Sequence, residues 1–161
     1  MIDRFNEMSD AEAVRELYSC FASQSWAVQV AAGRPYANFE DLWSACGVAW
    51  SSLAPADWMA AFAAHPRIGE RGGHAPDSSD REQSGVRAAP HATVDALAEE
   101  NRRYEARFGH VFLISASGRT ANEILTALRQ RMSNDAATEM DVAAAEHRKI
   151  TRLRLERMLS E

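Results

Sequence analysis

Residues 57–70 read DWMAAFAAHPRIGE, an apolar run that ends in a histidine and a proline. Trp58, Phe62 and His65 are spaced i, i+4 and i+7, so they share one face of a helix. Pro66 disfavours helical geometry for the residue before it and cannot continue the hydrogen-bond ladder. The pattern predicts a helix with a buried stripe, at whose end the imidazole is half buried and half reachable.

Helical patterns of the same kind account for most of the chain. The exception is the apolar run 110–115 (HVFLIS), which could be a strand, but one short strand does not make a sheet. The sequence therefore predicts an all-α fold, a single-domain bundle of roughly eight helices over residues 1–161. Helices are expected after Ser9, over 22–32, after Asn38, from Pro55, after Ser79, over 92–108, after Thr120 and over 136–159.

Length and charge exclude several classes of protein. A net charge of −5 argues against a nucleic-acid or acidic-membrane binder, which would show a basic field. No apolar run approaches the ~20 residues that span a bilayer, and MIDRFNEMSD lacks the apolar core of a secretory signal. Cys20 and Cys46 lie in helical patterns, as reduced, buried thiols would. We expect a cytoplasmic protein with neither nucleic acid nor membrane as a partner.

Residues 79–85 read SDREQSG and allow two interpretations. Ser79 and Glu82 fit a capping box, which satisfies backbone donors and needs no substrate. Alternatively, a helix N-terminus offers N–H groups to an anionic or carbonyl ligand. Glu82 would then add a carboxylate base and Gln83 an amide that both donates and accepts. One loop joins this segment to His65, so the two could face each other across a pocket.

The terminal helix carries a candidate arginine. Arg154 has Ile150 four residues before it and Met158 four after, so it lies on a partly apolar side, whereas Arg152 points elsewhere. Such an arginine is either a snorkelling side chain or a guanidinium that binds a carboxylate with two parallel hydrogen bonds. His65 likewise has a structural interpretation, because a helix-terminal histidine favours the negative end of the helix dipole.

Two further segments carry polar groups that could bind a ligand or a metal. Phe112 and Ile114 belong to an apolar run that leaves helical geometry, so its backbone groups need partners. A ligand rich in amide-like groups would suit them, although core packing is the default for both side chains. The other segment is the loop with His65, Glu70, His74 and Asp77, whose spacings match no metal-binding pattern. We therefore expect no metal site.

The ordered combination of motifs is more specific than any one of them. It comprises HPRIG at 65–69, SxxEQ at 79–83 followed by Gly85, YEARFG at 104–109, FLISASGR at 112–119, EILxxLxxR at 123–131 and ExxKIxxxRL at 146–155. In this order and spacing the chain resembles the 2-oxo-4-hydroxy-4-carboxy-5-ureidoimidazoline (OHCU) decarboxylases of uric acid breakdown. The resemblance covers nearly the whole sequence.

The resemblance implies an all-helical homodimer that needs neither a metal nor an organic cofactor. The implied substrate is OHCU, the unstable product of 5-hydroxyisourate hydrolysis, and the product is (S)-allantoin. His65 and Glu82 match the family's catalytic histidine and glutamate. Residues that match substrate-binding positions are Pro66, Ser79, Gln83, Phe112, Ile114 and Arg154.

Two other functions are compatible with the same residues. One is a helical module that binds a ureide without turning it over, and the other is a metal-dependent ureide hydrolase that uses the loop histidines. Intact His65 and Glu82 favour the decarboxylase, because a histidine and a carboxylate beside the reacting carbon suit proton transfer.

Overall fold

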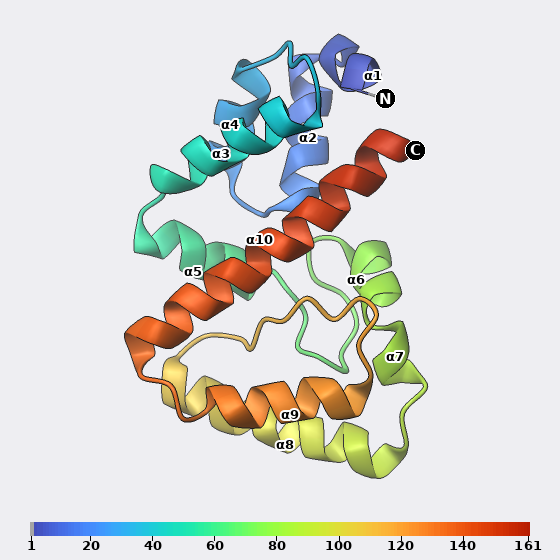
Figure 1. Cartoon of the computed structure of the whole chain (residues 1–161), viewed down its shortest axis with the longest axis vertical. Coiled ribbons are helices and arrows are strands. Elements are labelled where there is room, and N and C mark those ends of the chain that lie inside the picture. Colours follow the sequence, from blue (N-terminus) through green and yellow to red (C-terminus); the bar gives the residue numbers. More distant parts are fainter. Residues whose placement is uncertain (1) are drawn as a thin grey trace. The chain divides into compact units, whose positions relative to one another are not determined.

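The computed structural model describes residues 2–161, and in that range it contains ten helices and no strand (Figure 1). Eight of the ten have seven or more residues, so the expected all-α fold is confirmed. The helices are α1 Ile2–Glu7, α2 Asp10–Cys20, α3 Gln24–Ala32, α4 Phe39–Ser51, α5 Pro55–Ala63, α6 Pro76–Glu82, α7 Ser84–Arg87, α8 His91–Phe108, α9 Ala121–Arg131 and α10 Ala136–Ser160.

Most helix ends follow from the local sequence. Ser9 and Glu12 form a complete capping box at the start of α2. Asn38 and Thr120 cap α4 and α9 by accepting a backbone hydrogen bond on the side chain. Gly109 ends α8 in the left-handed conformation, with φ of 76°. The helix starts predicted after Ser9, Asn38 and Thr120 are confirmed, and α8 ends at Phe108 as expected.

The chain divides into two compact units, each with its own core. The first comprises Met1–Ala61 and Thr151–Glu161, and the second Phe62–Ile150. The first core is rich in aromatic rings: Trp26 stacks on Trp50 at 5.5 Å between centroids, and Phe21 lies 5.1 Å from Trp26. Its cysteines, Cys20 and Cys46, are buried. Burial raises the pKa of the Cys46 thiol, which therefore stays protonated.

In the second unit, α8 and α9 pack against each other and enclose an apolar core with Leu97, Tyr104 and Leu128. Between these helices the chain runs through the non-helical segment 110–120, which crosses Figure 1 above α9 before it enters that helix. Residues 110–115 pair with no strand in the described chain. Their backbone therefore depends on side chains and other partners for its hydrogen bonds.

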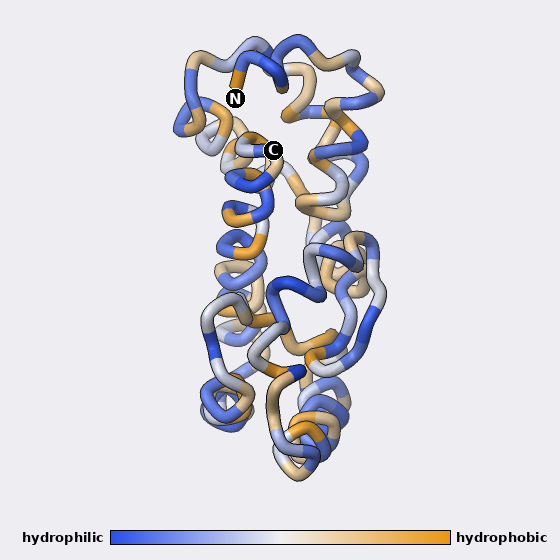
Figure 2. The backbone as a smooth tube through the Cα atoms, turned by 90° about the vertical axis from the view of Figure 1, so that its right-hand side faces the viewer, coloured by the Kyte–Doolittle hydropathy of each residue, from blue (hydrophilic) through white to orange (hydrophobic). Residues whose placement is uncertain are grey.

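The terminal helix, expected over 136–159, runs from Ala136 to Ser160. In Figure 2, hydrophilic and hydrophobic residues are interspersed along the helix that leads to the C-terminus. Helices α5 and α10 each contribute residues to both units. Across residues 2–161, no helix combines the length and apolarity needed to cross a membrane.

Candidate active site

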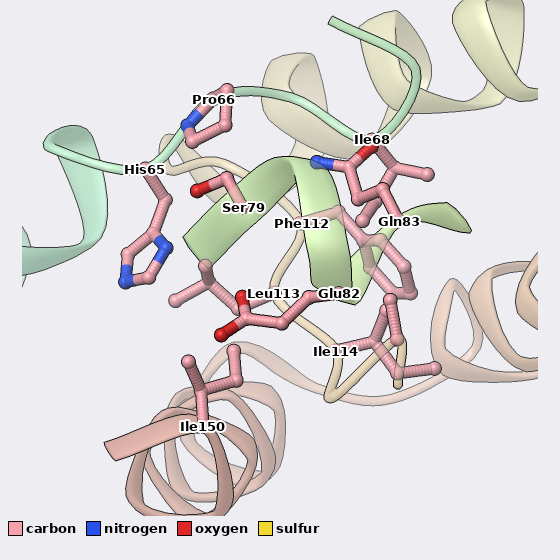
Figure 3. A pocket seen from close by; sticks show the side chains of 11 residues that line it. His65, Pro66, Ile68, Ser79, Glu82, Gln83, Phe112, Leu113, Ile114 and Ile150 are labelled. Carbon is pink, nitrogen blue, oxygen red and sulfur yellow. The ribbon is translucent and has the colours of Figure 1, made fainter. Parts of the chain in front are cut away.

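A small pocket lies within the second unit (Figure 3). It encloses about 310 Å³ of space between its lining atoms, part of it open to solvent. Seven of the predicted site residues line it: His65, Pro66, Ser79, Glu82, Gln83, Phe112 and Ile114. The apolar side chains of Ile68, Leu113, Ala116 and Ile150 complete the wall.

The histidine lies just beyond its helix. We expected the helix to reach His65, but α5 ends at Ala63, and the His65 N–H donates to the Phe62 carbonyl at 3.1 Å in a closing turn. The prediction was wrong by two residues because Pro66 pushes the preceding residue out of helical geometry. The imidazole is still 8 % exposed and faces the pocket.

The loop after Pro66 is held against the end of α5. The His74 N–H donates to the Ala64 carbonyl at 3.0 Å, and the His74 ring meets the His65 ring edge-on at 5.0 Å. Gly73 permits this approach, because a Cβ there would lie 2.8 Å from the Ala64 oxygen. Among the described residues, no group of three or more His, Cys, Asp or Glu side chains is arranged to hold a metal.

The capping-box interpretation of Ser79 and Glu82 is wrong. Helix α6 begins at Pro76, and no side chain caps it. Ser79 is the fourth residue of the helix, and its N–H donates to the Ala75 carbonyl at 3.0 Å. Proline suits the first helical position because it needs no partner for an N–H there. Ser79 and Glu82, both buried, therefore face the pocket (Figure 3).

Gln83 connects the two sequence motifs. Its Oε1 accepts a hydrogen bond from the Gly69 N–H at 2.8 Å, which holds the HPRIG turn in place. Figure 3 shows its amide nitrogen on the side of Ser79, so this end can donate to a ligand. The neighbouring Gly85 is needed for packing, because a Cβ there would lie 2.3 Å from the Arg119 oxygen.

A buried polar network fixes the extended wall of the pocket. The Arg131 Nη1 donates to the Leu113 carbonyl at 2.6 Å, and the guanidinium lies 4.4 Å from the centre of the Phe112 ring. Arg131 also pairs with the fully buried Glu139, which accepts a hydrogen bond from the Tyr104 hydroxyl. Burial and this carboxylate raise the pKa of Tyr104. Arg131 thus supplies the Leu113 carbonyl with a hydrogen bond that a neighbouring strand would provide in a sheet.

The two candidate arginines belong to the first unit and have different surroundings there. Arg154 is 3 % exposed, and its Nη1 donates to the Ser19 carbonyl at 3.3 Å. Arg152 lies at the surface, with ion pairs to Glu40 at 2.9 Å and Glu156 at 3.1 Å. The helical-face argument separated a buried arginine from a surface one, and the substrate-binding role of Arg154 stays a prediction.

One residue beside the pocket was not predicted from the sequence. His147, on α10, is completely buried, and its Nε2 lies 2.8 Å from the Nε2 of His65. Its spacing was the available signal: it precedes Ile150 by three residues and so shares that residue's helical face. The sequence around His147 does not indicate which residue its ring contacts.

Comparisons with known proteins concern the chain as a whole. A sequence model described as OHCU decarboxylase matches residues 6–156. A 2-oxo-4-hydroxy-4-carboxy-5-ureidoimidazoline decarboxylase of Amia calva is 32% identical over 81% of this chain and 77% of its own length. The uric acid degradation bifunctional protein TTL of Arabidopsis thaliana is 36% identical over 88% of this chain.

The bifunctional relatives are longer than this chain. It spans 46% of the Arabidopsis thaliana protein and 32% of a uric acid degradation bifunctional protein of Bacillus sp. (strain TB-90). Among solved structures, an OHCU decarboxylase crystallised in the presence of (S)-allantoin has a TM-score of 0.80 and 33% identity, covering 91% of this chain and 99% of that one. By its sequence and its fold, this chain belongs to the OHCU decarboxylase family.

Proposed function

We propose that this chain converts OHCU to (S)-allantoin by releasing the 4-carboxylate as CO₂ and protonating one face of the intermediate that remains. The observation that carries the proposal is the pocket in which His65 and Glu82 lie beside the hydroxyl of Ser79 and the amide of Gln83. The 33% identical relative that was crystallised in the presence of (S)-allantoin supports this choice of product.

The substrate can accept the electrons of its own decarboxylation. When the bond from C4 to the carboxylate breaks, the electron pair forms a C4=C5 double bond and the ring C5=N bond opens onto nitrogen, which takes up a proton. The 4-hydroxyl then loses a proton and becomes a carbonyl, while C5 gains one. The sum is one proton consumed and one CO₂ released. An external electron sink is not needed for this balance.

The reaction therefore moves protons at the ring nitrogen, at the 4-hydroxyl and at C5, while the ring must be held still. His65 and Glu82 are the titratable side chains among the residues that line the pocket, and we assign them to the 4-hydroxyl and to C5. Protonation from one side gives a single enantiomer, which is the main benefit over the spontaneous reaction. Ser79, Gln83 and the backbone at Phe112 and Ile114 hold the ring and ureido amides, and Pro66 shapes the wall.

We assign the substrate carboxylate to Arg154. Its burial supports this choice, and so does the engagement of Arg152 in ion pairs at the surface. Arg154→Lys should raise KM, because a point charge does not reproduce the planar fork of the guanidinium. An unchanged KM for that variant, together with a raised KM for Arg152→Lys, would show that the other arginine binds the substrate.

The decisive experiment measures the stereochemistry of the product. OHCU is generated in place from urate by the upstream oxidase and hydrolase, and the circular dichroism of allantoin is followed. The wild type should give the (S)-enantiomer faster than the spontaneous reaction, and His65→Ala should give racemic product while far-UV helicity is kept. Racemic product at the spontaneous rate with the wild type would favour a ureide-binding module. Loss of turnover after exhaustive chelation would favour the metal-dependent hydrolase.

We further propose that the chain acts as a single-domain homodimer in the cytoplasm. The family resemblance supports the dimer, and burial of both cysteines, Cys20 and Cys46, fits a reducing compartment. Light scattering coupled to size-exclusion chromatography should give twice the mass of one chain. A monomeric mass at the concentration of the activity assay would contradict the dimer, and cell fractionation tests the compartment.

A further inference from the structure

His147 belongs to none of the roles assigned so far, yet it makes the closest contact with the proposed catalytic histidine. The two Nε2 atoms are 2.8 Å apart, and the ring planes cross at 78° with 4.5 Å between centroids. His147 has no exposed surface, and its ring packs on Phe62 at 5.6 Å. Water is therefore excluded from this hydrogen bond on the side of α10.

The contact restricts where the protons of both rings can lie. Two ring nitrogens at this distance share one hydrogen bond, so one Nε2 carries a proton and the other accepts it. If His65 donates, its neutral ring keeps a lone pair on Nδ1, and if His65 accepts, Nδ1 carries the proton. Both rings cannot be fully protonated, because two N–H groups would then face each other. The protonation pattern of His65 is thus tied to that of His147.

Because Nε2 of His65 is bound to His147, the Nδ1 atom is the ring nitrogen that can act in the pocket. Figure 3 shows one ring nitrogen on the side of Ser79 and Glu82 and the other on the side away from them. The charged or titratable groups around the pair come from three elements. They are His74 in the loop, Glu82 on α6, and Glu146 beside His147 on α10, which pairs with Lys149 at 2.8 Å.

We propose that His147 is the positioning residue of His65. Through the Nε2–Nε2 hydrogen bond it holds the imidazole in one orientation, with Nδ1 toward the pocket, and keeps that nitrogen in one protonation pattern. The contribution of His147 to catalysis rests on the proposed function, whereas the hydrogen bond itself does not. A carboxylate plays the corresponding part in many catalytic sites, and here a second imidazole replaces it.

Kinetics of three variants test the proposal. His147→Leu should lower kcat about ten- to hundredfold with KM within about twofold, because substrate contacts remain and only proton transfer is impaired. His147→Gln should recover most of the rate, since an amide can donate to or accept from the His65 Nε2. The matched control is His110→Leu: His110 is also buried and lies 5.3 Å from the Phe62 ring, but it does not line the pocket. Its kcat per folded molecule should be unchanged.

Equal losses of kcat in His147→Leu and His110→Leu would overturn the proposal, since both would then reflect packing on Phe62. A rise in KM without a fall in kcat in His147→Leu would also overturn it. Failure of His147→Gln to exceed His147→Leu would show that the hydrogen bond is not what His147 provides.

Imidazole ¹⁵N spectra of the substrate-free protein supply a readout that does not need turnover. The His65 signals, identified by their loss in His65→Ala, should show one tautomer in the wild type and in His110→Leu. In His147→Leu they should shift toward the averaged pattern of an unrestrained imidazole. Unchanged His65 signals in His147→Leu would refute the positioning role. If the wild type proved inactive, these spectra would still decide the pairing, so the two proposals fail separately.

Discussion

Residues 9–12 and 79–82 read Ser-Asp-Ala-Glu and Ser-Asp-Arg-Glu, and they make different structures. In the first segment the Ser9 N–H donates to Glu12 at 3.0 Å, and the Glu12 N–H donates to the Ser9 hydroxyl at 3.3 Å. This pair starts α2 at the surface. In the second segment the serine and the glutamate lie inside α6, are buried, and line the pocket.

Whether a Ser-x-x-Glu sequence caps a helix depends on the residues that precede it. Three residues before Ser79 stands Pro76, which starts the helix and so gives the Ser79 N–H a helical partner. No proline precedes Ser9, and that serine is left to satisfy the first turn of its helix. One segment therefore contributes to stability, and we assign the other to catalysis.

The largest expected effect is that of Glu82→Gln on turnover. Loss of a group that transfers protons should lower kcat about 10²- to 10⁴-fold, with little change in melting temperature, because the amide keeps the volume of the carboxylate. The stereochemical assay and thermal unfolding measure both quantities. Glu12→Gln is the matched control, and it should leave kcat unchanged. A fall in melting temperature with full activity in Glu82→Gln would mean that Glu82 serves only the fold.

Ser79→Ala should raise KM about tenfold, which corresponds to one hydrogen bond of about 1.4 kcal/mol to a bound polar group. Its effect on stability should be smaller than that of losing a helix cap, because Ser79 does not cap α6. Initial rates at increasing OHCU concentration give KM, and urea unfolding gives the free energy of unfolding. An unchanged KM would remove Ser79 from the set of substrate-binding residues.

Ser9→Ala should show the opposite pattern. Removal of the cap should cost about 1 kcal/mol of unfolding free energy, because the N–H groups of the first turn lose their partner. The kinetic constants should stay at wild-type values. Urea unfolding followed by far-UV circular dichroism measures the loss. If Ser9→Ala were as stable as the wild type while Ser79→Ala unfolded more easily, the division between the two segments would be reversed.

The smallest effect is the pH dependence of that same cap. Hydrogen bonds from the Ser9 hydroxyl and N–H hold the pKa of Glu12 below its ordinary value. Because the folded-state pKa is the lower one, this stabilisation is present above the unfolded pKa of about 4.3 and is lost as pH falls through the folded value. The stability difference between wild type and Ser9→Ala should therefore narrow below about pH 4. A constant difference across that range would contradict the capping box.

Local signals predicted the helices well where each depended on its own residues. Ser9, Asn38, Thr120 and Gly109 act at helix ends through hydrogen bonds or backbone freedom within a few positions, so they could be read directly. The predicted start of α6 after Ser79 was wrong, because Pro76 is also a helix-start signal and lies three residues earlier. The candidate site residues came from spacing and resemblance, and seven of them line one pocket.

What the sequence determined by itself is the helical fold, its main boundaries, and which side chains carry acid–base and hydrogen-bonding chemistry, because these depend on neighbours within one or two helical turns. Contacts between residues far apart in the sequence became known only from the tertiary structure. The contact of His65 with His147 joins residues 82 positions apart, and the Arg131 bond to Leu113 joins residues 18 apart. Such pairs form when packing brings distant segments together and excludes water between them. A local sequence pattern does not show which distant residue a side chain will contact.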